Sequence, residues 1–173
     1  PFGIDIENYQ INKNLNSNKI RVFHLGAMDW KPNLEAVGWL LKDIWPMVLQ
    51  KTPNAELHLA GKNMPDWLVN ENQKNVINHK NVESAIDFMS KYDIMIVPIL
   101  SAGGIRVKII EGMALGKTII STSVGAEGLD CTANKNILIA ENPDEFANAV
   151  YELSKNINKI TRVGENARLH ISE

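Results

Sequence analysis

The chain has 173 residues, of which 20 are acidic and 18 are basic, and its formal net charge is −2 at pH 7. A hydrophobic content of 45% is enough for one domain with its own core, so a disordered chain is excluded. The near-neutral balance of charges also argues against nucleic acid as a partner, because such proteins carry a clear excess of basic residues.

Apolar segments with strand-like spacing alternate along the chain with segments of helical spacing. Strands are predicted at residues 20–25, 55–60, 75–78, 93–100, 118–122 and 136–140. Helices are predicted at residues 34–49, 83–92, 105–115, 142–155 and from 158 onward, with a loop and a short helix within 63–74. Ser84 and Asn142 are suited to cap two of these helices, and Gly116 is suited to end a third.

This alternation predicts an α/β fold, a Rossmann-like parallel sheet with helices on both faces. The strand at 93–100 is the most apolar, so we expect it at the centre of the sheet. Ligands of such sheets bind at the carboxyl ends of the strands. The loops that matter for function are therefore residues 26–32, 61–65, 79–84, 101–106 and 123–129.

The most informative segment is residues 98–129, PILSAGGIRVKIIEGMALGKTIISTSVGAEGL. Gly103 and Gly104 form either a plain tight turn or a turn that lets a ligand approach the backbone, before a helix whose start attracts anions. Arg106 has the planar guanidinium that suits a phosphate. Lys108 can bind the same anion or pair with Glu111 three positions on, and the residue pattern favours neither choice.

Four further residues have a functional interpretation and a structural one. Glu111 has mostly apolar neighbours, so its carboxylate is suited to accept hydrogen bonds from both hydroxyls of a ribose; the alternative is an ion pair on an exposed face. Lys62 follows a strand directly and can reach a phosphate, or it is an ordinary loop lysine. Gly26 is suited to close approach by a ligand in the first loop, whereas we expect Trp30 to serve in packing.

Several segments in a fixed order resemble one known family. They are MDWKPNLEAVGWLLKDIWP (28–46), AELHLAGK (55–62), YDIMIVPILSAGGIRVKIIEGMALGKTIIST (92–122) and VGAEGL (124–129). Together they resemble the C-terminal, donor-binding lobe of a GT-B glycosyltransferase of the retaining group 1, or family 4, type. The resemblance implies that residues 1–173 form one nucleotide-sugar-binding domain, a fragment without the N-terminal acceptor lobe, and residues 1–9 resemble the segment that enters this lobe.

The resemblance also implies roles for individual residues. It places Gly26, Gly61, Val82 and Glu111 at the nucleotide and Lys62 at the diphosphate. With the residues singled out above, the predicted donor-binding residues are Gly26, Gly61, Val82, Gly103, Gly104, Lys108 and Glu111, and the predicted catalytic residues are Lys62 and Arg106. Glu111 corresponds to the second glutamate of the family's E-x7-E motif, which binds ribose. Gly103 stands where that motif has its first glutamate, and a subgroup with a G-G-x-R-x-K loop is more similar to this chain.

The expected function is transfer of a sugar, with retention, from a nucleoside-diphosphate sugar to a glycan or a lipid-linked acceptor in polysaccharide biosynthesis. We expect no metal and no other cofactor, since the four histidines lack ligand spacing, and we expect the isolated chain to be inactive. The single Cys131 and the short apolar runs favour a cytoplasmic protein, or one held peripherally at the inner face of the membrane.

Three alternatives to this function stay open. A non-catalytic nucleotide-binding or regulatory module could keep the fold, and a sugar-nucleotide epimerase or hydrolase could use the same scaffold. A dinucleotide-binding oxidoreductase is disfavoured, because the first strand–helix turn, LGAMDWKPN, lacks the G-x-G-x-x-G pattern.

Overall fold

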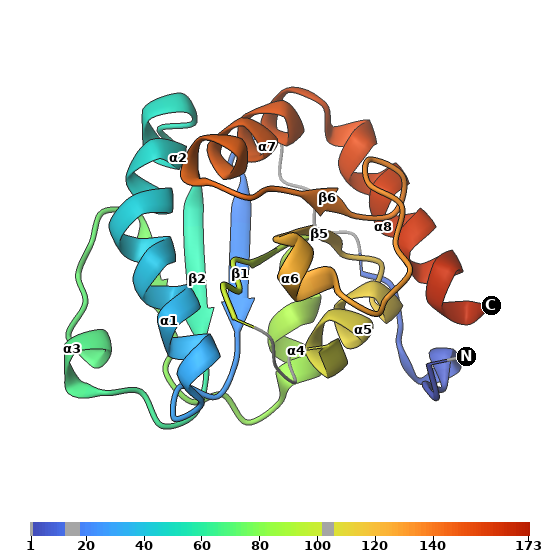
Figure 1. Cartoon of the computed structure of the whole chain (residues 1–173), viewed down its shortest axis with the longest axis horizontal. Helices are drawn as coiled ribbons and strands as arrows, with labels where there is room; N and C mark the ends of the chain where they lie inside the picture. The colour runs from blue at the N-terminus through green and yellow to red at the C-terminus, as the bar shows by residue number, and fades with distance from the viewer. Residues whose placement is uncertain (1, 13–17, 102–105) are drawn as a thin grey trace.

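The computed structural model describes residues 2–12, 18–101 and 106–173 of the chain. A six-stranded sheet runs through the middle, with every neighbouring pair of strands parallel and the order β3-β2-β1-β4-β5-β6 (Figure 1). The strands are Arg21–Leu25 (β1), Glu56–Ala60 (β2), Val76–Asn78 (β3), Ile94–Val97 (β4), Thr118–Ser121 (β5) and Leu138–Ile139 (β6). The chain builds outward from β1 in one direction and from β4 in the other, so the topological switch point lies between these two central strands.

Helices follow the strands as the sequence pattern predicts. They are Lys31–Trp39 (α1), Trp45–Lys51 (α2), Asp66–Val69 (α3), Ala85–Ser90 (α4), Arg106–Ala114 (α5), Ser123–Ala126 (α6), Pro143–Lys155 (α7) and Ile157–Ser172 (α8), with a 3-10 turn at Ile6–Asn8 (η1) and a π turn at Leu40–Ile44 (η2). The π turn joins α1 to α2, so the predicted helix 34–49 is one continuous helical segment. Pro46 lacks the N–H of a regular α-helical bond, which accounts for the widened turn before it.

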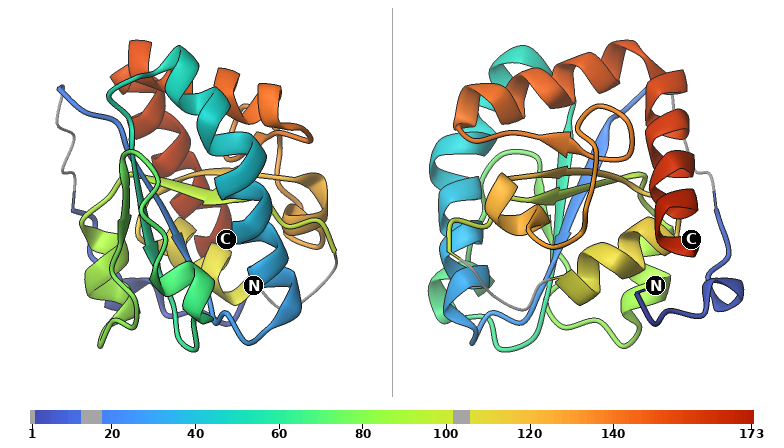
Figure 2. Two further views of the ribbon diagram at one scale, coloured as in Figure 1. Left: turned by 90° about the vertical axis from the view of Figure 1, so that its left-hand side faces the viewer. Right: turned by 45° about the vertical axis from the view of Figure 1, so that its right-hand side comes forward.

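Successive residues of each central strand face two different cores. On β4, Ile94 and Ile96 pack with α1, η2, α2 and α7, whereas Met95 and Val97 pack with α4, α5 and α8. Both faces of β4 are therefore fully covered, as its continuous apolar sequence predicts. Figure 2 shows the two layers of helices on opposite sides of the sheet.

Local capping signals are confirmed where they were predicted. The side chain of Ser84 accepts the N–H of Asp87 at 3.1 Å and that of Asn142 accepts the N–H of Glu145 at 2.9 Å, so both residues begin their helices. Gly116 has a φ of +70° and ends α5. These ends could be predicted because each depends on residues within one helical turn.

Two predicted segments differ most from the structure, and the bounds of the other predicted elements shift by one to three residues. The loop predicted at 123–129 opens with the short helix α6, because the side chain of Thr122 caps it by accepting the N–H of Gly125. The strand predicted at 136–140 is reduced to β6, because Asn136 turns back and its Oδ1 accepts the N–H of Thr132 at 2.8 Å.

The N-terminal segment, residues 2–12, lies beside α5 and α8. The guanidinium of Arg168 on α8 donates to the backbone carbonyls of Tyr9 and Ala114, and to that of Ile6 at 3.2 Å. The buried ammonium of Lys117 lies 3.4 Å from the carbonyl oxygen of Asn12. In the described ranges, no helix combines the length and the apolar character needed to cross a bilayer.

Candidate functional site

A pocket of about 220 Å³ lies at the carboxyl ends of the central strands. Its walls come from the end of β1, the loops after β1, β2 and β3, the start of α4 and the first turn of α5. Its lining residues are Leu25, Gly26, Ala27, Gly61, Lys62, Asn81, Val82, Ala85 and Lys108. The pocket therefore opens next to the β1–β4 switch point, where a doubly wound sheet leaves room for a ligand. Among the described residues, two ammonium groups and no carboxylate line it, which favours an anionic ligand.

The back of this pocket is formed by two loops in direct backbone contact. Gly26 donates its N–H to Ala60 at 3.2 Å, and Met28 donates its N–H to the carbonyl of Lys62 at 2.8 Å. A β-carbon at position 61 would lie 1.8 Å from the carbonyl oxygen of Gly26. Glycine at 61 is thus required by the contact between the loops themselves, before any ligand is considered.

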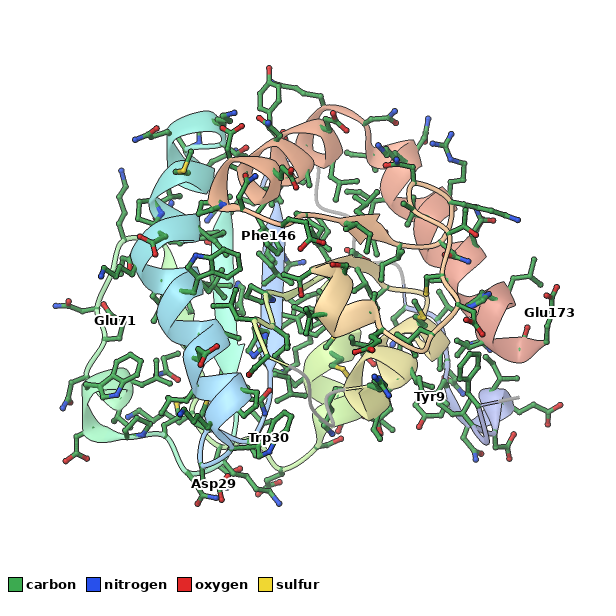
Figure 3. The ribbon with its side chains drawn as sticks, viewed as in Figure 1. Tyr9, Asp29, Trp30, Glu71, Phe146 and Glu173 are labelled. Carbon is green, nitrogen blue, oxygen red and sulfur yellow. The ribbon has the colours of Figure 1, made fainter. Side chains whose placement is uncertain are left out.

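Asn33, on the first turn of α1, holds the first loop in place. Its Nδ2 donates to the carbonyl of Ala27 at 2.9 Å, and its side chain lies where a β-carbon on Gly26 would have to be, 2.8 Å from Nδ2. Trp30 precedes α1 and packs against the hydrophobic core, as predicted, while the side chain of Asp29 is exposed at the surface (Figure 3). The hydrogen bond from Asn33 and the packing of Trp30 therefore hold the first loop in place.

The first turn of α5 carries the predicted cations Arg106 and Lys108. Lys108 lines the pocket and its Nζ lies 3.2 Å from Oε2 of Glu111, so the ion pair is present, while anion binding by Lys108 stays a prediction. Glu111 is 20% exposed at its side chain, and its charge contributes, after burial, to raising the pKa of the nearby Tyr9 hydroxyl. Glu111 is thus adjacent to the pocket through Lys108 without lining it.

Arg106 points to a different part of the same edge. Its guanidinium lies 3.6 Å from the carboxylate of Glu127, beyond α6, and a β-carbon on Gly128 would lie 3.4 Å from its Cζ. Residues two positions apart on an α-helix project to nearly opposite sides, which explains why Arg106 and Lys108 diverge. The structure therefore does not bring Arg106 into the pocket with Lys62.

The pocket thus collects Gly26, Gly61, Lys62, Val82 and Lys108 of the residues that the sequence singles out. Gly103 and Gly104 lie outside the described residues, and the roles assigned to all nine predicted residues stay predictions. Sequence reasoning missed Leu25, Ala27, Asn81 and Ala85 in the lining, and Glu127 beside Arg106. The sequence signal for these residues is their position at or shortly after the carboxyl ends of predicted strands.

His24 occupies the crevice between the two central strands. The β1–β4 ladder pairs Val22 with Ile94 and Phe23 with Met95, and the ring of His24 follows, with Nδ1–H donating to the carbonyl of Ile96 at 2.8 Å. Burial lowers the pKa of His24 below its ordinary value, opposed by this hydrogen bond. His24 is therefore a neutral core residue, as its position in a strand predicts, and its hydrogen bond joins β1 to β4.

A second pocket of about 220 Å³ lies at the opposite, amino-terminal edge of the sheet. It is lined by Lys19, Lys51 and Lys155, which pair with Glu56, with Asp144 and with the ring of Tyr151, respectively. Lys51 and Lys155 also lie in the last turns of α2 and α7, where the helix dipole favours cations. These lysines are matched by the protein itself, so the pocket at the carboxyl edge is the candidate site.

Within the described ranges, His, Cys, Asp and Glu side chains form no group of three that could hold a metal ion. His24 and His58 are buried in strands, as predicted for core residues. The expectation that the protein needs no metal concerns the reaction and remains a prediction.

Comparison with known proteins matches residues 19–156 to the family of glycosyl transferases group 1. An uncharacterized 44.6 kDa protein in the cps region of Klebsiella pneumoniae is 29% identical over 162 residues, which cover 88% of this chain and 42% of that protein. An uncharacterized glycosyltransferase of Methanocaldococcus jannaschii is 31% identical over 111 residues, 62% of this chain and 31% of that protein. The chain thus spans less than half the length of the curated relatives that it matches.

Solved structures share the fold at low sequence identity. The C-terminal domain of the group 1 glycosyl transferase LpcC from Francisella tularensis has a TM-score of 0.72 at 14% identity, over 98% of this chain and 97% of that one. HepE from Anabaena in complex with UDP-glucose has a TM-score of 0.73 at 17% identity, over 98% of this chain and 51% of that one. A domain of this size and fold is therefore a complete structural unit in LpcC and half of a longer chain in HepE.

Proposed function

This chain belongs to the glycosyl transferases group 1 family, and we propose that it binds the nucleoside-diphosphate sugar from which its protein transfers the sugar. The observation that supports this most directly is the convergence of Lys62 and Lys108 on a pocket at the switch point of the sheet. An anionic ligand of the size of a nucleotide fits both the charge and the place of this pocket. The relative HepE has been solved with UDP-glucose, which supports the same class of ligand.

Each part of the donor has a proposed position. The base and ribose occupy the pocket between Gly26 and Val82, with Glu111 accepting hydrogen bonds from the ribose hydroxyls once Lys108 turns to the diphosphate. Lys62 neutralises charge on the diphosphate, and the positive amino end of the α5 helix dipole favours the same group. Catalysis in the full protein requires stabilising the charge that develops on this leaving group, and Arg106 and Lys62 supply fixed positive charge for that purpose.

The remainder of the reaction lies outside this chain. We propose that a further lobe of the same protein supplies the acceptor site, that the acceptor is a glycan or a lipid-linked sugar, and that the transfer retains the anomeric configuration. The chain alone then binds the donor weakly and transfers nothing. We also propose that neither step needs a metal, so that EDTA leaves binding and transfer unchanged.

The proposal is tested by titrating the chain with UDP, GDP, ADP and NAD and measuring binding by ligand-observed NMR. We expect one nucleoside diphosphate to bind more tightly than NAD. Glu111→Gln should weaken binding of that ribonucleotide by about tenfold, whereas its 2′-deoxy form, which lacks one hydroxyl, should change far less. Equal binding of all four ligands would contradict the proposal. So would an equal loss of affinity for the ribonucleotide and for its 2′-deoxy form.

A further inference from the structure

We propose that Glu127 binds the hydroxyl groups of the sugar that the donor carries. This inference rests on the proposed function and extends it to the part of the donor beyond the diphosphate. Glu127 lies in the segment after α6 and is 63% exposed at its side chain. No role follows for it from the pocket, which it does not line.

The order of the strands sets the direction in which a bound donor extends. The pocket lies over the loops of β3, β2 and β1, and α5 follows β4, the next strand across the sheet. The segment with Glu127 follows β5, one strand further on. A donor consists of base, ribose, diphosphate and sugar in a fixed covalent order. With its nucleoside in the pocket and its diphosphate at the start of α5, its sugar continues toward the end of β5.

The two cations of α5 mark the same direction. Lys108 faces the pocket, where it pairs with Glu111, and Arg106 faces away from it, where it pairs with Glu127. A diphosphate between these two cations has a carboxylate on each side. Glu111 is next to the nucleoside, and Glu127 is next to the group on the far phosphate.

The backbone around Glu127 is held firmly, which suits a group that must select a ligand. On one side, Thr122 donates its hydroxyl to the carbonyl of Ile99 at 2.5 Å and caps α6. On the other side, Leu129 is 1% exposed and its carbonyl lies 2.6 Å from Nε2 of His170. The exposed carboxylate therefore projects from a rigid segment between two buried anchors.

The pair with Arg106 leaves the carboxylate available to a sugar. An ion pair in which both side chains are this exposed contributes little free energy, so solvent or ligand can take up the remaining lone pairs of Glu127. A carboxylate accepts hydrogen bonds from two neighbouring hydroxyls at once, and such groups are the main polar feature of a hexose. Glu127 can thus bind the sugar while it keeps Arg106 beside the diphosphate.

Saturation-transfer NMR on the chain tests this, because one ligand reports on its sugar and its base separately. UDP-glucose, UDP-galactose, GDP-mannose and ADP-glucose are each compared with the matching nucleoside diphosphate. We expect Glu127→Gln to weaken the preferred sugar nucleotide by about tenfold, to remove saturation from the sugar protons relative to the base protons, and to leave the nucleoside diphosphate unchanged. Asp130→Asn is the matched control, since Asp130 is an exposed acid of the same segment at a φ of +51° that asparagine tolerates.

Two results would overturn the inference while the proposed function survives. An equal change for the nucleoside diphosphate and its sugar conjugate would mean that Glu127 acts only through Arg106. No change for either ligand, or no saturation of sugar protons in the unchanged chain, would mean that Glu127 does not touch the sugar. If the unchanged chain bound none of these nucleotides, the proposed function itself would be wrong, and this inference with it.

Discussion

Two polar regions of the molecule are built in opposite ways. The pocket edge presents Lys62, whose side chain is exposed and whose ammonium has no hydrogen-bond or ion-pair partner among the described residues. The second region, which we call the histidine–tyrosine cluster, consists of Glu56, His58, His79 and Tyr92 between the sheet and α4. There Nδ1 of His58 lies 2.9 Å from Nε2 of His79, and Nε2 of His58 lies 3.4 Å from Glu56.

The difference between the two regions separates groups that serve binding from groups that serve stability. In the cluster, His79 donates to His58, His58 donates to Glu56, and the rings of His58 and Tyr92 stack at 4.3 Å, so the polar groups satisfy one another. Buried polar groups that are paired in this way stabilise the fold and need no ligand. At the pocket edge the backbone is paired, the ammonium of Lys62 has no partner among the described residues, and Lys108 has only the partly exposed ion pair with Glu111, so a ligand has charged groups to bind.

The largest expected effect concerns the backbone of the pocket edge. Gly61→Ala places a β-carbon 1.8 Å from the carbonyl oxygen of Gly26, so the β1 and β2 loops must separate. We expect the free energy of unfolding in urea to fall by about 3 kcal/mol or more. Gly38→Ala is the control, because nothing lies within 4 Å of its added carbon, and there a helix-interior alanine should stabilise by about 0.5–1 kcal/mol. A Gly61→Ala variant of unchanged stability would show that the loops are not a structural unit.

The next effect concerns the cation at the same edge. Lys62→Met should weaken binding of the preferred nucleoside diphosphate by about tenfold, because a charged hydrogen bond to phosphate is lost. Since Lys62 has no partner among the described residues, the free energy of unfolding should stay within about 0.5 kcal/mol. Lys80→Met is the matched control, an exposed lysine near the pocket that does not line it. Loss of stability with unchanged binding would reverse the roles assigned to the two regions.

The histidine–tyrosine cluster should make stability depend on pH. Burial lowers the pKa of His58, and it also lowers that of the less buried His79, where Lys91 adds to the effect. The unfolded chain then binds more protons than the folded one just below the ordinary histidine pKa, so stability falls as the pH decreases through that range. Between pH 7.5 and pH 5.5 we expect a loss of about 1 kcal/mol that His58→Gln reduces.

His24 contributes to the same pH dependence from the other side of β1, since burial lowers its pKa too. The midpoint of urea unfolding is therefore measured at several pH values for the unchanged chain and for His58→Gln, and the two sets of midpoints are compared. Nucleotide affinity should not follow this difference, because the cluster lies outside the pocket lining. Identical pH profiles for the two proteins would mean that the cluster does not bind protons on unfolding.

The sequence predicts those features of the fold that depend on residues close together in the chain. The caps at Ser84 and Asn142 and the apolar strand β4 each follow from a few adjacent residues. The approach of Glu127 to Arg106 joins the segment after α6 to the first turn of α5, and no local pattern signals it. The same holds for Asn33, whose amide supports a loop several residues earlier. Pairwise placement of this kind depends on how the helices pack on the sheet.

The smallest effect on stability should come from the pair of Lys108 and Glu111. Their side chains are 35% and 20% exposed, and the pair spans one helical turn, so its coupling free energy in a double-mutant cycle should be about 0.5 kcal/mol. The cycle uses Lys108→Met, Glu111→Gln and the double variant, with urea unfolding as the measurement. A small coupling means that a diphosphate can draw Lys108 away from Glu111 at little cost, which leaves the carboxylate available to a ribose. A coupling above about 2 kcal/mol would place this pair with the histidine–tyrosine cluster, as a structural contact that a donor could not displace.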